Sequence, residues 1–344
     1  MKFDYSISII RVLAMFAIVL GHCLCYNIGT WSNRFGQPVV CGELTRALIG
    51  VVFMLALNAF VFISGLLYYR ISLTHKYDDT KKFIKNKILR LLLPYLFWGL
   101  LLCLIFYGKE TLSSILYGIS HLWFLLMLFD VFVFVTLTRR LWFRLSMTGY
   151  IATIVLLPFA YGFLVQRHLC PEIGGILQAF AYLPLFLAGM MTEKFGLGRK
   201  LVDKRYASIA GSILCVVAIV SIGMLHVPAS WLSQKLLSIV FLILIANILA
   251  GYAGMGIRND RVRHVLLFLD HYSLAIYIIH HILIHASLYY IPGFKAAMTN
   301  HYILCPSVLF ISVFFASLPL SYGISCMPGA KYIIGVEATH TQAS

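Results

Sequence analysis

The sequence SISIIRVLAMFAIVLGHCLCY, residues 6–26, is the first membrane-length apolar run of the chain. It contains two ionisable side chains, Arg11 and His22, which are costly on a helix in contact with lipid. Eleven residues at about 100° each return to within about 20° of the starting direction, so both side chains lie on one helix face. At about 1.5 Å per residue they lie roughly 16 Å apart along the axis and cannot touch. The pair therefore predicts the two ends of an internal cavity that holds a long ligand.

The composition is typical of a polytopic membrane protein. Hydrophobic residues make up 61% of the 344 and charged residues 11%, whereas about 25% of a soluble domain is charged. Several apolar stretches are each long enough to cross a hydrocarbon core of about 30 Å as a helix. We therefore expect an all-α bundle of about ten transmembrane helices. The apolar stretches lie near residues 6–26, 44–67, 89–107, 119–138, 147–166, 174–192, 206–226, 232–253, 265–289 and 302–327.

Lysine and arginine are distributed unequally between the segments that connect these stretches. Counted together with the first residues of the adjoining stretches, the connections after the second, fourth, sixth and eighth stretches hold eighteen of them, and the odd-numbered connections hold five. Because such residues are concentrated on the cytoplasmic side of membrane proteins, the even-numbered connections and both termini are expected to be cytoplasmic. This asymmetry accounts for most of the net charge of +15. It indicates an anionic lipid surface as the partner and gives no support for nucleic acid.

Domain organisation follows from the short connections, which leave no room for a soluble domain. We expect a single transmembrane domain over residues 1–330 and a short cytoplasmic tail over residues 331–344. The first apolar run is too long for a typical signal peptide and no small-residue cleavage site follows it, so it is expected to remain as the first span. The cysteines form no CxxC pair. Only Cys41 and Cys170 lie in expected outer connections, where an oxidising compartment permits a disulfide.

Cationic side chains are expected near the cytoplasmic end of the bundle. Arg11 lies in the inner half of the first helix, and Lys87 and Arg90 lie at the inner start of the third. Guanidinium and ammonium groups bind phosphate oxygens through charge-assisted hydrogen bonds. The three residues therefore predict a binding site for the phosphate groups of a cytoplasmic ligand.

Imidazole side chains are expected in the outer half of the bundle. His22 lies near the outer end of the first helix, His121 at the outer start of the fourth, and His280, His281 and His285 well into the ninth. Burial favours the neutral imidazole, which can accept a proton from a substrate. The histidines therefore predict acid–base chemistry at this depth.

Each of these polar residues can also have a purely structural role. Arg11 can extend along its own stem toward the cytoplasmic surface, and a lone histidine such as His22 near a helix end is often structural. His281 and His285 have the i, i+4 spacing of a metal site. No carboxylate-rich cluster completes such a site, so no metal is expected. Asp130 is either a functional carboxylate or the buried partner of an arginine, and the sequence does not choose between the two.

Five segments of the chain resemble, in order, those of the membrane-bound acyltransferase-three family. RVLAMFAIVLGH, residues 11–22, is similar to its opening motif, in which an arginine precedes a histidine with ten residues between. One departure concerns Lys87 and Arg90, where the family often has two arginines, because lysine keeps the charge but lacks the planar fork of arginine. The other four segments are FVFISGLLYYR at 60–70, KNKILRLLLPYLFW at 85–98, HLWFLLMLF at 121–129 and HYSLAIYIIHHILIH at 271–285.

The resemblance implies an acyl-CoA-dependent O-acyltransferase in a bacterial cytoplasmic membrane. Such proteins move an acyl group, often acetyl, from cytoplasmic acyl-CoA to a hydroxyl of a cell-surface or lipid-linked saccharide. Coenzyme A is long and polyanionic, so its phosphates are expected at Arg11, Lys87 and Arg90. Its thioester is then expected near His22, which we interpret as the general base; an acyl-histidine intermediate is a variant of this mechanism.

The remaining candidate residues are expected to support the acceptor. His121, Tyr277, His280 and His281 are placed to orient it or to stabilise the developing oxyanion. Ser64 and Gly65, in the second of the five segments, are expected to allow a close helix approach rather than to supply a nucleophile.

Two other functions are compatible with the sequence. The same cavity can serve an exporter or flippase of a polysaccharide or lipid-linked sugar, although such carriers usually have discontinuous helices and polar residues in both halves. A non-catalytic membrane scaffold is the third possibility, and the buried Arg11 and His22 argue against it.

Overall fold

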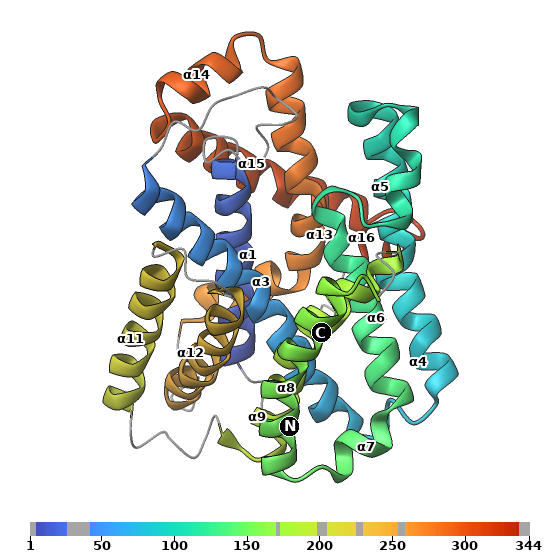
Figure 1. Ribbon diagram of the computed structural model, residues 1–344. Helices are drawn as coiled ribbons and strands as arrows, with labels where there is room; N and C mark the ends of the chain where they lie inside the picture. Colours follow the sequence, from blue (N-terminus) through green and yellow to red (C-terminus); the bar gives the residue numbers. More distant parts are fainter. Residues whose placement is uncertain are drawn as a thin grey trace.

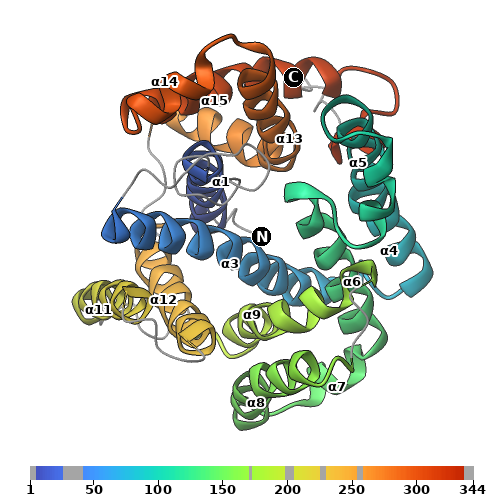
Figure 2. The same cartoon turned by 45° about the horizontal axis from the view of Figure 1, so that its top comes forward.

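The computed structural model describes residues 5–25, 42–169, 173–197, 205–224, 230–253 and 259–336. Every regular element in these ranges is a helix, and the helices form one bundle (Figures 1 and 2), so the predicted all-α fold is confirmed. Cys41 and Cys170, the expected candidates for a disulfide, lie outside the described residues. The long helices are α1 (Tyr5–Cys25), α3 (Glu43–Ser72), α5 (Leu93–Leu102), α6 (Trp123–Leu137), α8 (Met147–Gln166), α9 (Ile176–Lys194), α11 (Arg205–Met224), α12 (Ser230–Ala253), α13 (Asp260–Tyr290) and α15 (Leu304–Ser325).

Shorter helical elements extend or connect the long ones. They are α4 (Thr80–Lys87), η1 (Ile88–Leu92), η2 (Cys103–Tyr107), η3 (Lys109–Leu116), η4 (Ser120–Leu122), α7 (Arg139–Arg144), η5 (Ile173–Gly175), α14 (Phe294–Asn300) and α16 (Ala330–Ile334).

The membrane-spanning stretches agree with the predicted bundle. Eight helical segments of the described chain are long and apolar enough to cross a bilayer, and α11 and α12 contain shorter apolar stretches. The third span differs most from its predicted range, because it runs continuously over Thr80–Tyr107. Asp79 begins it as the N-cap, accepting a hydrogen bond from the amide of Lys82 at 3.0 Å, which satisfies one free N–H of the first turn.

A π-helical turn, η1, carries Arg90 within this third span. It lies directly before Pro94, which has no N–H to donate to the carbonyl four residues earlier. The wider turn accommodates this missing hydrogen bond. Lys87 and Arg90 therefore project from an irregular part of the helix, at the junction of α4, η1 and α5.

The core of the bundle includes a close crossing between α3 and α9. A Cβ added to Gly65 would overlap the carbonyl of Phe186, and one added to Gly189 would overlap the carbonyl of Phe62. Both phenylalanines are fully buried. Small residues at such crossings let membrane helices pack backbone to backbone, so the expectation for Gly65 is confirmed.

The last described segment packs into the bundle. The indole of Trp98 donates a hydrogen bond to the carbonyl of Ile333 at 2.8 Å, and Arg90 Nε donates to the carbonyl of Gly335 at 3.1 Å. Ile334 and Val336 are buried. Residues 331–336, which the sequence assigned to a tail, therefore belong to the packed structure, because their apolar side chains are covered by α5 and its neighbours.

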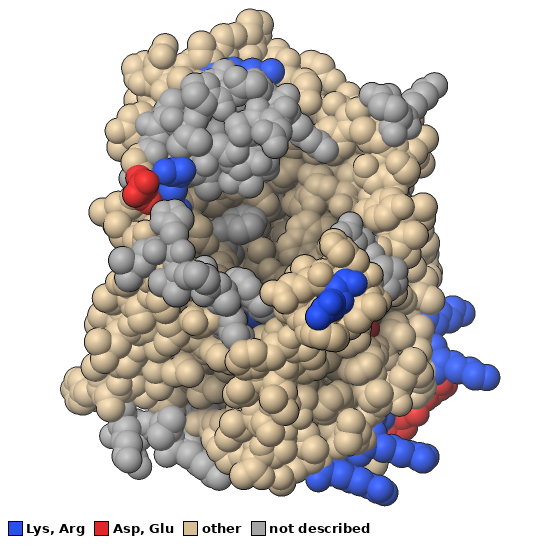
Figure 3. Space-filling view, viewed as in Figure 1, with Lys and Arg blue, Asp and Glu red and all other residues tan. Residues whose placement is uncertain are grey.

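Charged side chains gather at one end of the bundle, which we call the basic end. It includes the end of α3, α4, α7 and the end of α9, and Figure 3 shows lysine and arginine concentrated over α4 and α7. Arg70 forms a two-bond pair with Glu193 between α3 and α9, with N–O distances of 2.8 and 2.7 Å. The opposite end, where α1 and α13 finish, we call the distal end. Which end faces the cytoplasm stays a prediction.

Candidate functional site

Helices α1 and α13 run parallel and touch at two levels. Arg11 Nη1 donates to Asp270 Oδ1 at 2.6 Å, and the Ser8 hydroxyl donates to Asp270 Oδ2 at 2.8 Å. Closer to the distal end, His22 Nδ1 lies 2.8 Å from His280 Nε2. Each residue of the predicted pair on α1 therefore has its own partner on α13, and the two partners are ten residues apart.

A cavity is present toward the basic end, and it is lined by Arg11 but not by His22, so it accounts for only one end of the predicted cavity. It has a volume of about 320 Å³, and Arg11, Lys87 and Arg90 all line it. The structure thus brings together the three cations predicted to bind phosphate. Asp270 also lines the cavity, so the described wall carries three cationic side chains and one carboxylate.

Aromatic side chains form much of the remaining wall. Lys87 Nζ lies 3.5 Å from the ring centroid of Phe132 and 5.2 Å from that of Phe83, distances at which an ammonium group is attracted to the ring face. Tyr77, in the connection between α3 and α4, also lines the cavity. Burial raises the pKa of the Tyr77 hydroxyl, and the nearby Arg90 acts in the opposite direction. The hydroxyl is therefore neutral at pH 7 and can donate a hydrogen bond.

Five buried histidines form the second part of the site, which we call the histidine cluster: His22, His121, His280, His281 and His285. Their exposed fractions are 6%, 4%, 0%, 2% and 2%. The His22 ring centroid lies 5.0 Å from that of His280, 4.9 Å from that of His281 and 6.0 Å from that of His121. The rings of His121 and His281 stack with centroids 4.1 Å apart. His22, His121, His280 and His281 are therefore in mutual ring contact.

Backbone carbonyls determine which nitrogens of His22 and His280 carry protons. His280 Nδ1 lies 3.0 Å from the carbonyl of Ile276, which can only accept, so Nδ1 is the donor. In the neutral His280 ring, Nε2 is then an acceptor. It accepts the proton on His22 Nδ1, and the basic nitrogen of a neutral His22 is its Nε2. This relay gives His22 the tautomer that a general base requires.

His121 is held in place by two contacts with α13. Its Nε2 donates to the carbonyl of Ile278 at 3.2 Å, and the hydroxyl of Tyr277 donates to the backbone carbonyl of His121. The buried Nδ1 of His121 has no hydrogen-bond partner within the described residues. This nitrogen is therefore a free acceptor inside the histidine cluster.

Tyr277 connects the two parts of the site. Its side chain lines the cavity, and its hydroxyl is hydrogen-bonded to His121. Its ring centroid is 5.6 Å from that of Phe124, another residue of the cavity wall. The sequence predicted that Tyr277 orients the acceptor or stabilises the oxyanion; in this structure its single hydroxyl proton goes to the carbonyl of His121.

Two residues of the site were missed from the sequence. Asp270 stands ten residues before His280, as Arg11 stands eleven before His22, and this parallel spacing was the available signal. Tyr107, whose hydroxyl lies 3.2 Å from His285 Nε2, gave no such signal. It ends the third span among other aromatic residues.

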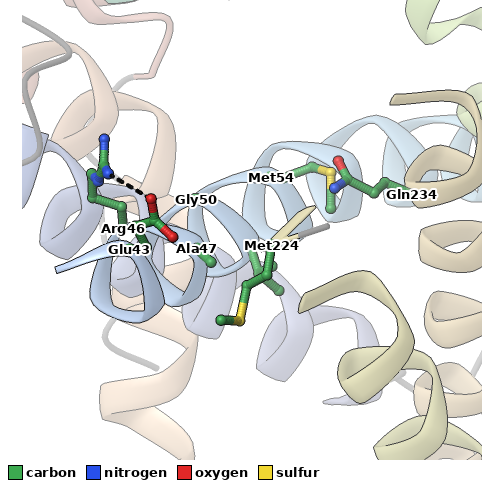
Figure 4. A pocket seen from close by; sticks show the side chains of 8 residues that line it. Glu43, Arg46, Ala47, Gly50, Met54, Met224 and Gln234 are labelled. Atoms are coloured by element: carbon green, nitrogen blue, oxygen red, sulfur yellow. Dashed lines mark ion pairs between the residues drawn. The ribbon is translucent and has the colours of Figure 1, made fainter. Parts of the chain in front are cut away.

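Other pockets of the described chain lie away from these residues. One of about 390 Å³ is lined by the start of α3, including Glu43 and Arg46, and by Met224 and Gln234 of α11 and α12 (Figure 4). A third, of about 280 Å³, lies between α6 and α9 and includes Asp130. No arginine pairs with Asp130 in the described part of the chain.

The histidine cluster does not have the arrangement of a metal centre. Within the described ranges, no group of three or more His, Cys, Asp or Glu side chains is placed to hold a metal ion. The i, i+4 pair His281 and His285 instead packs ring against ring, with centroids 4.5 Å apart.

A family model described as an acyltransferase domain matches residues 4–326. The chain belongs to the acyltransferase-three family. Its family domain extends from the start of α1 to the end of α15, and so contains the histidine cluster and all three cations of the cavity. No curated protein and no solved structure matches the chain. Membership in the acyltransferase-three family, together with the apolar helices, makes this protein a membrane acyltransferase.

Proposed function

We propose that this acyltransferase moves an acyl group, with acetyl as the expected one, from cytoplasmic acyl-CoA to a saccharide hydroxyl. The acceptor is a cell-surface or lipid-linked glycan, and the membrane is a bacterial cytoplasmic membrane with the basic end inside. One observation carries the proposal: the cationic cavity and the histidine cluster are joined through Tyr277.

The charge of the cavity supports a polyanionic donor. Three cationic side chains against one carboxylate leave an excess of positive charge on the described wall. Asp270 orients one edge of the Arg11 guanidinium and lowers its net attraction for anions. Lys87 and Arg90 add to the attraction for phosphate groups, and Arg11 is held in a fixed direction by its ion pair.

The chemistry proposed for the histidine cluster is general base catalysis by His22. Its Nε2 takes the proton of the acceptor hydroxyl, and the hydroxyl oxygen attacks the thioester carbonyl carbon. The C–O bond forms, the C–S bond breaks, and the proton on His22 passes to the sulfur of coenzyme A. His22 is neutral before and after the reaction. His121 and His281, whose rings contact His22, are placed to orient the hydroxyl.

Removal of Arg11 is expected to weaken binding of the acyl donor more than binding of the acceptor. Arg11→Ala should lower acyl-CoA affinity by about 10- to 100-fold, because hydrogen bonds to charged groups contribute about 1.5–3 kcal/mol. Isothermal titration with coenzyme A, compared with the acceptor KM, measures the two effects. Asp270→Asn is the matched control, because it keeps Arg11 and removes the opposing charge, and should preserve donor binding. Equal loss of donor and acceptor affinity in Arg11→Ala would count against a donor site here.

Loss of the His280 imidazole is expected to reduce kcat through His22. His280→Leu removes the acceptor for His22 Nδ1–H and should lower kcat by about 10²-fold or more, as for other catalytic histidines whose tautomer is no longer fixed. His280→Gln offers an amide oxygen at a similar position and should retain more activity. The ratio of the two kcat values checks the relay, and equal activities of the two variants would argue against it.

Acyl transfer is distinguished from export by one assay with the purified protein. Radiolabelled acetyl-CoA and a saccharide acceptor should yield labelled saccharide ester and free coenzyme A thiol in equal amounts. Movement of unmodified sugar across a proteoliposome membrane, without thiol release, would favour the exporter instead.

A further inference from the structure

A group of aromatic side chains lies beyond the distal end of the histidine cluster, and we call it the distal aromatic patch: Phe106, Tyr107, Tyr289 and Tyr290. Phe106 and Tyr107 end the third span in η2, and Tyr289 and Tyr290 end α13. The Phe106 ring centroid lies 5.5 Å from that of Tyr289 and 6.1 Å from that of Tyr290. Tyr289 is 41% exposed and Tyr290 65%. Tyr289 and Tyr290 therefore lie at the surface of the bundle.

Polar contacts connect this patch to the histidine cluster. Tyr107 Oη lies 3.2 Å from His285 Nε2 and 3.0 Å from Ser120 Oγ. The His285 ring centroid lies 4.5 Å from that of His281. The His281 centroid lies in turn 4.9 Å from that of His22. His281, His285 and Tyr289 follow one another at intervals of four residues, so they lie on one face of α13.

Ser120 is held in an unusual backbone conformation at this point. Its φ is +49°, in the left-handed region that serine rarely adopts. Such strain persists where the surrounding structure imposes it, and it is frequent at binding and catalytic sites. Ser120 is partly exposed, and its hydroxyl lies beside that of Tyr107 at the boundary between the buried histidines and the patch.

We propose that the distal aromatic patch is the acceptor subsite, where a pyranose ring stacks on Tyr289 and Phe106 while one of its hydroxyls reaches the edge formed by Tyr107, Ser120 and His285. Aromatic faces carry partial negative charge and attract the C–H groups on the flat side of a sugar ring. The phenol, hydroxyl and imidazole offer both donors and acceptors to a sugar hydroxyl. This assignment rests on the proposed acyl transfer, because it supplies the acceptor for His22.

A membrane anchor is the competing explanation for the exposed tyrosines. Tyrosine is enriched where helices leave the bilayer, and this accounts for Tyr289 and Tyr290 as isolated side chains. It does not account for the hydrogen bonds of Tyr107 to His285 and Ser120, or for the continuous ring contacts from Tyr289 to His22. Tyr302, which is 42% exposed in the turn before α15, is a matched tyrosine outside the patch.

Saturation-transfer NMR tests the subsite without requiring turnover. The protein is placed in lipid nanodiscs, because sugar-based detergents would compete, and is mixed with methyl glycosides of glucose, galactose, mannose and N-acetylglucosamine. The expected result is transfer to the ring C–H protons of at least one glycoside. Tyr289→Leu should lose this signal, whereas Tyr302→Leu and His22→Ala should keep it. No signal with any glycoside, or equal signals from Tyr289→Leu and Tyr302→Leu, would overturn the subsite.

Kinetics with a glycoside acceptor give a second measurement. Tyr289→Leu is expected to raise the acceptor KM about three- to tenfold, within the range of an aromatic contact, and to leave the acetyl-CoA KM unchanged. Tyr107→Phe keeps the ring, and should lower kcat while largely preserving glycoside binding. If the wild-type protein binds a glycoside through Tyr289 but consumes no acetyl-CoA, the proposed function fails and the subsite stands. If Tyr289→Leu transfers the acyl group with an unaltered acceptor KM, the subsite fails and the proposed function stands.

Discussion

Replacement of His22 by alanine or glutamine is expected to abolish measurable acyl transfer. General acid–base assistance is typically worth about 10²–10⁴-fold in rate, and the hydrogen bond to His280 gives His22 the tautomer that this role requires. The His22 ring is 6% exposed, so no solvent-borne base readily replaces it. The measurement is the initial rate of thiol release from acetyl-CoA in the presence of a saccharide acceptor.

Two controls separate chemistry from folding in the His22 variants. Coenzyme A binding should be unchanged, because Arg11, Lys87 and Arg90 line a cavity that does not include His22. His301→Ala removes an exposed imidazole at the distal end and should leave the rate unaltered. Full activity of His22→Gln at normal membrane abundance would remove the base role from this residue.

A side chain at Gly65 or Gly189 is expected to prevent stable packing of α3 against α9. Gly65→Val or Gly189→Val would force a side chain into the backbone carbonyl of Phe186 or Phe62. Overpacking costs about 1–3 kcal/mol even where side chains can adjust, and here two helix backbones have to separate. We therefore expect a loss of at least about 3 kcal/mol, seen as low membrane abundance and a reduced Tm in detergent.

Gly50→Ala is the matched control for this prediction, because Gly50 lies on the same helix α3 and a Cβ there would meet nothing within 4 Å. It should be neutral or slightly stabilising, since alanine has the higher helix propensity. A Tm for Gly65→Val equal to that of Gly50→Ala would show that the α3–α9 crossing is looser than described. Because Phe62 and Phe186 belong to the core and not to the cavity wall, activity per folded molecule should change less than abundance.

The all-α bundle and much of the site were predictable from periodicity and charge. Apolar runs of membrane length indicated the spans, because burying a polar backbone in lipid leaves the helix as the main solution. The separation of Arg11 from His22 along one helix predicted a single cavity with these residues at its two ends, whereas the cavity of the structure is lined by Arg11 and does not reach His22. Predictions from periodicity succeed where a single helix determines which side chains share a face.

Contacts between helices were harder to predict. The pairing of Arg11 with Asp270 requires that α1 and α13, nearly the whole chain apart, run parallel in the same register. Helix periodicity carries no information about that register. The same holds for Tyr107 and His285, which come together only because η2 ends beside α13. The packed segment 331–336 was missed because its few apolar residues form no membrane-length run.

The two contacts between α1 and α13 also bear on the length of ligand that the site can accept. Arg11–Asp270 fixes the register of the two helices near the basic end. His22–His280 fixes it again roughly 15 Å further along the helix axis, at about 1.5 Å per residue. Because Arg11 and His22 are on the same helix, α1 itself keeps the interval between them constant, and the two contacts with α13 fix the position of each side chain. Under the proposed function, donors are then selected by the length of the arm between phosphate and thioester, independently of the affinity of either end.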